Sequence, residues 1–226
     1  MNILVVAAHP DDEVLGCGGT IRRHADAGDT VDILCVCDGV SARRGSANSD
    51  ALVERRMAAK QAANILGAQE PKFLDFPDNR LDEIPLLDIV REIEATIEGL
   101  QPKIVYTHFV GDLNIDHTIV SRAVLTACRP LKGSNIERIL NFEIPSSTEW
   151  ASPQPFNSFT PQYFIDIDHQ LEAKLAAIRA YEMEIREFPH PRSVQAIKAL
   201  AHWRGATAGL SAAEAFHVER LIINDN

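Results

Sequence analysis

The sequence predicts an α/β fold in which a Rossmann-like, mostly parallel sheet carries helices on both faces. Apolar stretches typical of buried strands alternate with amphipathic stretches typical of helices along most of the chain. The chain has 226 residues, of which 46% are hydrophobic and 24% are charged, as in an ordinary globular protein. We expect a single domain over 1–226, with an α/β core at 1–144 and a helical and loop elaboration at 145–226 that faces the substrate.

The individual elements follow from short apolar runs for strands and from longer runs with helical periodicity for helices. Gly67 marks the end of the second helix, because glycine favours the left-handed conformation found there. Residues 145–161 are rich in Pro and Ser without periodicity and predict a long surface loop, which in compact domains is often functional. In chain order we expect strand 3–8, helix 14–27, strand 30–37, helix 50–66, strand 72–76, helix 86–100, strand 103–107, helix 117–128, strand 138–144, strand 163–167, helix 169–186 and helix 193–208.

Charge and composition exclude several classes of protein. A formal net charge of -10 argues against nucleic-acid binding, which depends on Lys and Arg neutralising phosphates. No apolar run approaches the roughly 20 residues that span a bilayer, and the N-terminus lacks the pattern of a secretion signal. We therefore expect a soluble cytoplasmic protein without a transmembrane segment. Association into a homo-oligomer is left open, since α/β enzymes of this size commonly form oligomers.

Four cysteines are too few, in apolar surroundings, to suggest a disulfide scaffold. We expect them to be buried thiols in a reducing compartment. Cys35 and Cys37 lie two residues apart in a predicted strand, so strict alternation would place both on one face. The four are Cys17, Cys35, Cys37 and Cys128.

The most informative stretch is His9-Pro10-Asp11-Asp12-Glu13, which follows the first predicted strand directly. Carboxylates crowded at one strand end repel each other unless a cation or a substrate compensates, and a divalent metal is the obvious candidate. Ligands of open α/β sheets bind outside the carboxyl ends of the strands. The loop from His108 to His117 opens at the same edge, so these histidines are expected to lie near the acidic cluster.

His9 and Asp12 are three residues apart in a turn that opens a helix, which lets both side chains point to one side. With His117 they form a two-histidine, one-carboxylate set, which is enough for a catalytic zinc site with an open position for water. Asp11 is then free to take a proton from that water, whose pKa a metal lowers from about 15.7 towards 7. The alternative for Asp11 or Asp12 alone is a helix N-cap.

These motifs resemble the two signatures of the PIG-L (LmbE-like) N-acetylglucosaminyl deacetylases. The resemblance implies one zinc ion per chain, or another divalent metal such as Fe²⁺, bound by His9, Asp12 and His117, with Asp11 as the general base. It implies that the chain removes an acetyl group from a glucosamine-type sugar and that Arg55 binds this small-molecule substrate. The stretches that carry it are His9 to Glu13 with the glycines after them, Asp112 to His117, Arg55 to Gly67, Ser146 to Trp150, His190 to Ser193, and Arg204 to Phe216.

Three more residues are predicted at the site. Many family members carry an oxyanion-stabilising histidine where this chain has Asn114, which can donate a hydrogen bond but cannot carry a positive charge. We place Asn114 among the catalytic residues on this ground. His108 and Arg192 are predicted substrate contacts. Arg192 can bind a phosphate or carboxylate in a bidentate manner. A structural ion pair is the alternative for Arg192.

Three other functions are alternatives to the deacetylase. Gly16, Gly18 and Gly19 resemble a dinucleotide-binding loop, but Ile21 stands where its last glycine would fall, and the acidic residues would repel a pyrophosphate. Two histidines and a carboxylate also form the site of non-haem iron oxygenases. A sugar-binding module that has lost catalysis is the third, non-enzymatic alternative.

Overall fold

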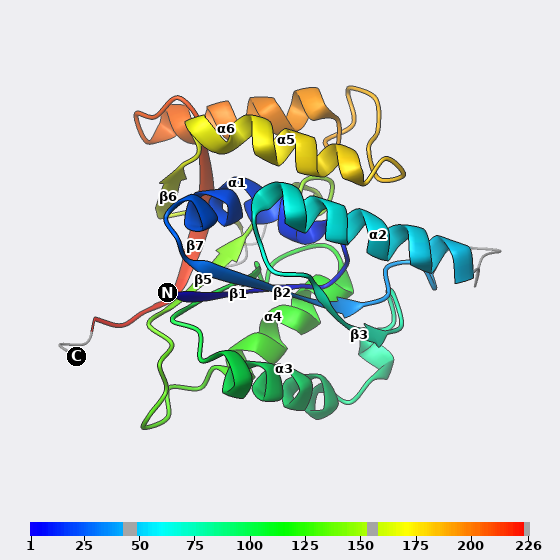
Figure 1. The fold of residues 1–226 in the computed structure, drawn as a ribbon, viewed down its shortest axis with the longest axis vertical. Helices are drawn as coiled ribbons and strands as arrows, with labels where there is room; N and C mark the ends of the chain where they lie inside the picture. The colour runs from blue at the N-terminus through cyan, green and yellow to red at the C-terminus, as the bar shows by residue number, and fades with distance from the viewer. Residues whose placement is uncertain (43–48, 153–157, 224–226) are drawn as a thin grey trace.

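The computed structural model describes residues 1–42, 49–152 and 158–223, and Figure 1 shows their arrangement around one central sheet. Among these residues seven strands form that sheet, in the order β3-β2-β1-β4-β5-β7-β6. The pairs among β1 to β5 are parallel, whereas β7 is antiparallel to both β5 and β6. The strands are β1 (Asn2–Ala7), β2 (Thr30–Cys37), β3 (Lys72–Phe76), β4 (Ile104–His108), β5 (Arg138–Phe142), β6 (Tyr163–Asp166) and β7 (Ala213–Leu221).

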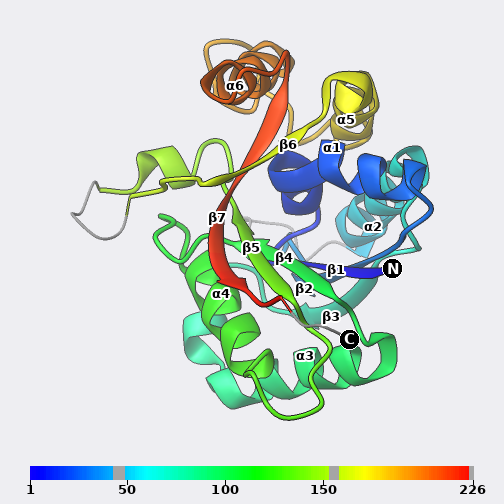
Figure 2. The ribbon, with the colours of Figure 1, turned by 90° about the vertical axis from the view of Figure 1, so that its left-hand side faces the viewer.

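Helices cover both faces of the sheet, as the alternating pattern predicts. Figures 1 and 2 show α3 and α4 on one face, α1 and α2 on the other, and α5 and α6 further out on the side of α1 and α2. The helices are α1 (Asp12–Asp26), α2 (Ser49–Leu66), α3 (Leu86–Leu100), α4 (Ile115–Ala127), α5 (Leu171–Ala180) and α6 (Val194–Thr207), with short 3₁₀ helices at Leu81–Glu83, Thr148–Trp150 and Asp168–Gln170. The predicted α/β class is confirmed. Within the described residues, no helix has the length and apolar character needed to cross a membrane.

Two apolar cores lie on the two faces of the sheet and follow the two-residue alternation of its strands. Val5 and Ile33 pack with α1, α2 and α5, whereas their neighbours Leu4 and Leu34 pack with α3 and α4. A fully buried side chain of this size contributes roughly 1.5–3 kcal/mol to stability. Because both faces are covered, the open edge at the carboxyl ends of the strands is where polar side chains collect.

Cys35 and Cys37 do not share a face, and that prediction was wrong. Cys35 packs in the core on the side of α1, and Cys37 packs in the core on the side of α3. The pairing register between β2 and β3 shifts between these two residues, which interrupts the strict alternation. All four cysteines are buried free thiols, as expected from their apolar surroundings.

The last strand, β7, is not predicted from the sequence, and the helix expected at 169–186 ends six residues early, at Ala180. β7 lies between β5 and β6 in the sheet. The part of the chain after residue 144 therefore supplies two strands of the central sheet in addition to helices that cover it. Its polar residues hide its strand character, and one of them, Glu214, is buried for a reason that the sequence does not show.

Glu214 satisfies the backbone of a kinked helix. α1 is interrupted at Cys17, whose φ of -146° and ψ of 26° are not helical, so the amides that follow lack helical acceptors. The Gly19 and Thr20 N–H groups donate to the two carboxylate oxygens of Glu214 at 2.9 and 2.7 Å. Lys174 donates to the same carboxylate at 2.5 Å. This pairing holds the part of α1 that follows the kink against β7.

Candidate metal centre

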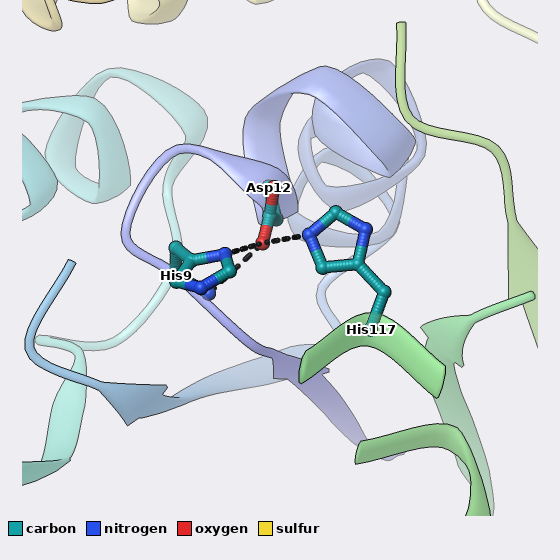
Figure 3. A group of neighbouring side chains, drawn as sticks. All are labelled: His9, Asp12 and His117. Atoms are coloured by element: carbon teal, nitrogen blue, oxygen red, sulfur yellow. Dashed lines mark hydrogen bonds and ion pairs between the residues drawn. The ribbon is translucent and has the colours of Figure 1, made fainter. Parts of the chain in front are cut away.

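The edge formed by the carboxyl ends of β1 and β4 brings together the histidines and carboxylates of two distant segments. Figure 3 shows the side chains of His9, Asp12 and His117 pointing toward one another. His9 and Asp12 come from the turn between β1 and α1, and His117 comes from the first turn of α4. All three are buried, with 7%, 0% and 1% of their surfaces exposed, respectively.

The donor atoms of these residues fit a single metal ion. Asp12 Oδ2 lies 3.1 Å from His9 Nδ1 and 3.3 Å from His117 Nε2. One donor atom from each residue can be chosen so that all lie within 4.8 Å of one another. Asp12 Oδ1 and His117 Nε2 are buried and have no hydrogen-bond partner in the described structure, a state that costs about 1–3 kcal/mol per group. A bound cation would satisfy both atoms.

Asp11 stands beside this set in a strained conformation. Its φ of 133° lies in a region that side-chain-bearing residues rarely adopt. The Asp11 carbonyl accepts from the Val14 and Leu15 N–H groups, and its own N–H donates to Glu13 Oε2 at 3.0 Å. Tyr181 donates to the other oxygen of Glu13 at 2.5 Å. These contacts hold the Asp11 carboxylate at the wall of a 220 Å³ pocket that His9 also lines.

Two arginines meet the two oxygens of Asp11. Arg55 Nη2 donates to Oδ1 at 3.2 Å, and Arg192 Nη1 donates to Oδ2 at 3.1 Å. Both guanidinium groups also pair with Glu184. Burial raises the pKa of Asp11 above its ordinary range, and the two arginines oppose that rise. Burial therefore favours the protonated form of Asp11, whereas the two arginines favour the carboxylate.

His117 is oriented by Asp112, a residue of the second motif that the sequence alone does not assign to the site. Asp112 Oδ1 lies 3.0 Å from His117 Nδ1. Asp112 accepts hydrogen bonds from the hydroxyls of Ser147 and Thr148 and from the Asn114 N–H. Burial raises the pKa of Asp112, but His117 and the two hydroxyls lower it to about 2. The carboxylate is therefore ionised and holds the Nδ1 side of the ring, which leaves Nε2 facing Asp12.

His9 has a comparable support on its second nitrogen. His9 Nε2 lies 3.0 Å from Asp116 Oδ2 and 3.1 Å from Asp78 Oδ1. Asp116 also accepts from the Asn79 and Leu81 N–H groups at 2.6 and 3.1 Å. The turn after β3 is thereby tied to the site. His9, Asp116 and Cys37 also form a second group that could hold a metal ion, with one ligand atom from each residue lying within 4.8 Å of the others.

His108 is not placed for the predicted substrate contact. Its side chain is fully buried, and its Nε2 accepts from the Ala8 N–H at 2.8 Å. The ring stacks on that of His117, with 4.0 Å between the centroids. Burial lowers the pKa of His108 well below its ordinary value, and His117 lowers it further. His108 is thus a neutral packing partner behind His117, which a substrate cannot reach in this structure.

Asn114 lies at the rim of the pocket, where it is the N-cap of α4. Its Oδ1 accepts from the Asp116 N–H at 2.9 Å, and its Nδ2 donates to Asn79 Oδ1 at 3.2 Å. The carbonyl side of the amide is therefore committed to the helix, and the amino group faces the pocket wall. Five predicted site residues line this one pocket: His9, Asp11, Arg55, Asn114 and Arg192.

Several residues of this site are not predicted from the sequence. Asp78 follows β3, so the rule that points to His9 at the end of β1 could have found it. Asp112 begins the motif that ends at His117, and its acidic side chain in that motif could have indicated a partner for His117. Glu184 lies in the turns after α5, and nothing in its local sequence points to Asp11.

Known proteins of similar sequence identify the family to which the chain belongs. The family described as PIG-L: GlcNAc-PI de-N-acetylase matches residues 4–128. A protein of Escherichia coli (strain K12) named Uncharacterized deacetylase YaiS is 31% identical over 185 residues, which cover 80% of this chain and 90% of that protein. The Diacetylchitobiose deacetylase of Thermococcus kodakarensis is 30% identical over 193 residues, covering 82% of this chain and 70% of that protein.

One relative has a different activity in its name. The 4-oxalmesaconate hydratase of Pseudomonas putida is 31% identical over 197 residues, which cover 78% of this chain and 71% of that protein. The family match spans more than half of the chain and includes both signatures on which the resemblance depends. The chain belongs to the PIG-L (LmbE-like) family.

Proposed function

We propose that this protein is a metal-dependent hydrolase that removes the N-acetyl group from a GlcNAc-type sugar or sugar conjugate. The observation that carries the proposal is the buried set of His9, Asp12 and His117. Asp12 Oδ2 faces one nitrogen of each histidine, and Asp12 Oδ1 is buried without a hydrogen-bond partner in the described structure. The Thermococcus relative, a deacetylase of diacetylchitobiose by name, supports the substrate class. The polar wall of the adjoining pocket suits a hydroxylated substrate.

Zinc is the metal that this donor set favours. Catalytic zinc is four-coordinate, and two imidazoles with one carboxylate leave its fourth position open for water. A zinc ion held by these residues supplies Lewis-acid activation and lowers the pKa of water to about 7. His9 and His117 bind in their neutral forms, and Asp12 binds as a carboxylate. Asp112 and Asp116 hold the outer nitrogens of the two rings, which keeps the inner nitrogens directed at the metal.

Asp11 performs the proton transfers in this proposal. As a carboxylate it accepts a proton from the attacking water, and as an acid it then gives that proton to the departing amine nitrogen. Arg55 and Arg192 hold its two oxygens, so the carboxylate keeps one orientation in both steps. Asn114 supplies an N–H donor at the rim for the oxygen on which negative charge develops.

Arg192 is the substrate contact in this arrangement. Its side chain is 21% exposed, whereas that of Arg55 is 8% exposed. It lines the pocket and reaches Ser146 Oγ at 2.8 Å, so the loop after β5 controls its position. Arg55 acts mainly by orienting Asp11.

The central experiment is to compare the wild type with D11N and with D88N, a change of an exposed aspartate on α3. Acetate release from GlcNAc and from N,N′-diacetylchitobiose is measured together with zinc content. We expect D11N to keep its zinc and to lose at least 10²-fold in kcat, while D88N resembles the wild type. Full activity of zinc-loaded D11N would overturn the role of Asp11.

The hydratase relative supports a second candidate, the addition of water to a carbon–carbon double bond of an unsaturated acid. Both reactions use an activated water and a carboxylate base, so assays with the two kinds of substrate distinguish them. Loss of absorbance from 4-oxalmesaconate without acetate release from any N-acetyl sugar would favour the hydratase. Abundant iron with oxygen uptake would favour an oxygenase, and saturable sugar binding without turnover would favour a binding module.

A further inference from the structure

A second cavity, of about 360 Å³, lies away from the metal centre beside the C-terminal half of α1. Side chains of α1, β4, β5 and β6 line it, and Figure 2 shows β6, an edge strand of the sheet, next to α1. Asp12 begins α1, and Arg23 is near its end. At a rise of 1.5 Å per residue, on the order of 15 Å of helix separates them. The cavity therefore shares a helix with the metal centre but none of its residues.

Two arginines in the wall of this cavity have no carboxylate partner among the residues that the structure describes. Arg23 Nη1 donates to the Asp166 carbonyl at 2.6 Å, and Arg138 Nη1 donates to the Tyr163 hydroxyl at 3.4 Å. Their other N–H groups make no such bond in the described structure. Arg23 is exposed and Arg138 is half-buried, so both guanidinium groups are accessible from the cavity.

A hydroxyl adds a further donor to the wall of this cavity. Tyr163 supplies it, since its oxygen accepts from Arg138 and leaves its own O–H free. Thr20 lies behind the wall and is fully buried, so its hydroxyl is out of reach of a ligand.

The remaining walls decide the kind of ligand. His24 is already committed, with Nδ1 2.8 Å from Asp29 Oδ2 and Nε2 2.9 Å from the Tyr106 hydroxyl. The carboxylate of Asp166 also lines the cavity, and it accepts from the Asp168 N–H. Phe164 and Leu210 supply apolar surface. The volume is in the range of small-molecule sites and exceeds what an inorganic ion needs.

We propose that this cavity binds a small organic oxyanion. Its carboxylate or phosphate group would be held by Arg23 and Arg138 with the Tyr163 hydroxyl, and its apolar body would lie against Phe164 and Leu210. Two guanidinium groups outweigh the single carboxylate of Asp166, and charge-assisted hydrogen bonds to an oxyanion are roughly twice as strong as those between neutral groups. This site does not depend on the proposed deacetylase activity.

Calorimetric titration of the zinc-loaded protein with phenyl phosphate, benzoate and inorganic phosphate tests the proposal. We expect phenyl phosphate or benzoate to bind with one site per chain and more tightly than inorganic phosphate. R138Q and R23Q are each expected to weaken binding about tenfold or more, whereas R91Q, at an exposed arginine of α3, leaves it unchanged. The stronger of the two organic probes identifies the head group.

Two further variants locate the site. Y163F keeps the ring but removes the hydroxyl donor from the cavity wall, so it should weaken binding severalfold without lowering the melting temperature of the ligand-free protein by more than a few degrees. H117A disrupts the metal centre and should leave the binding intact. Binding that survives both arginine changes, that disappears in H117A, or that is absent for all three probes overturns the proposal.

Discussion

Asp112 Oδ1 lies 3.0 Å from His117 Nδ1, and two hydroxyls from the loop after β5 donate to the same carboxylate. The metal-facing nitrogen of His117 is therefore positioned by a residue that does not itself face the metal. The hydrogen bonds from these hydroxyls join the loop after β4 to the loop after β5, so the orientation of His117 as a metal ligand depends on both loops.

The D112N variant is expected to weaken zinc binding by about 10- to 100-fold, because an amide fixes the imidazole less firmly than a carboxylate does. Competition with a chromophoric chelator measures the zinc affinity, and D88N serves as the control. With saturating zinc, part of the lost turnover should return. Unchanged zinc affinity in D112N would show that Asp112 has no role in orienting His117.

Zinc affinity should rise with pH. Burial lowers the pKa of His117, but Asp12 and Asp112 raise it by more, to about 9 in the metal-free protein. Only the neutral imidazole binds zinc, so a proton must leave His117 at any pH below about 9. The apparent Kd should therefore weaken by about tenfold for each unit that the pH falls below 9, and more steeply where His9, whose pKa is also raised, must lose its proton. A Kd that is flat between pH 6 and 8 would contradict this.

The arginines beside Asp11 should set the acidic limb of the rate profile. Arg192 lowers the pKa of Asp11, so R192Q should raise that pKa and move the limb of kcat/KM to higher pH. The measurement is kcat/KM from pH 5 to 9 for the wild type, R192Q and R91Q. A loss of rate in R192Q without any shift of the limb would mean that Arg192 acts on substrate binding alone.

Two glycine substitutions should have opposite effects on stability. A Cβ at Gly16 would lie 2.4 Å from Phe142 Cδ2, so G16A should cost about 1–3 kcal/mol through overpacking. A Cβ at Gly99, in α3, would have nothing within 4 Å, so G99A should gain up to about 1 kcal/mol in helix propensity. Urea unfolding of both variants measures the difference. Equal stability of the two would mean that Gly16 of α1 does not lie against Phe142 of β5.

Parallel strands explain why much of the site could be predicted. Their carboxyl ends meet at one edge of the sheet, so an acidic cluster after β1 and a histidine loop after β4 must approach each other. His9, Asp12 and His117 do so, and Arg55 and Arg192 lie beside Asp11. His108 was misplaced because a strand's last residue can point into the core as easily as into the pocket, and only packing decides which.

The sequence by itself determined the α/β class and the segments that meet at the metal centre, because periodicity and the position of polar residues at strand ends are local properties. Only the tertiary structure decided the support for these residues. Glu184 reaches Arg55 from the turns after α5, and Glu214 on β7 satisfies a kink in α1. Such contacts join residues more than 100 positions apart, and their free energy comes from burying a polar group together with its partner, which no local pattern records.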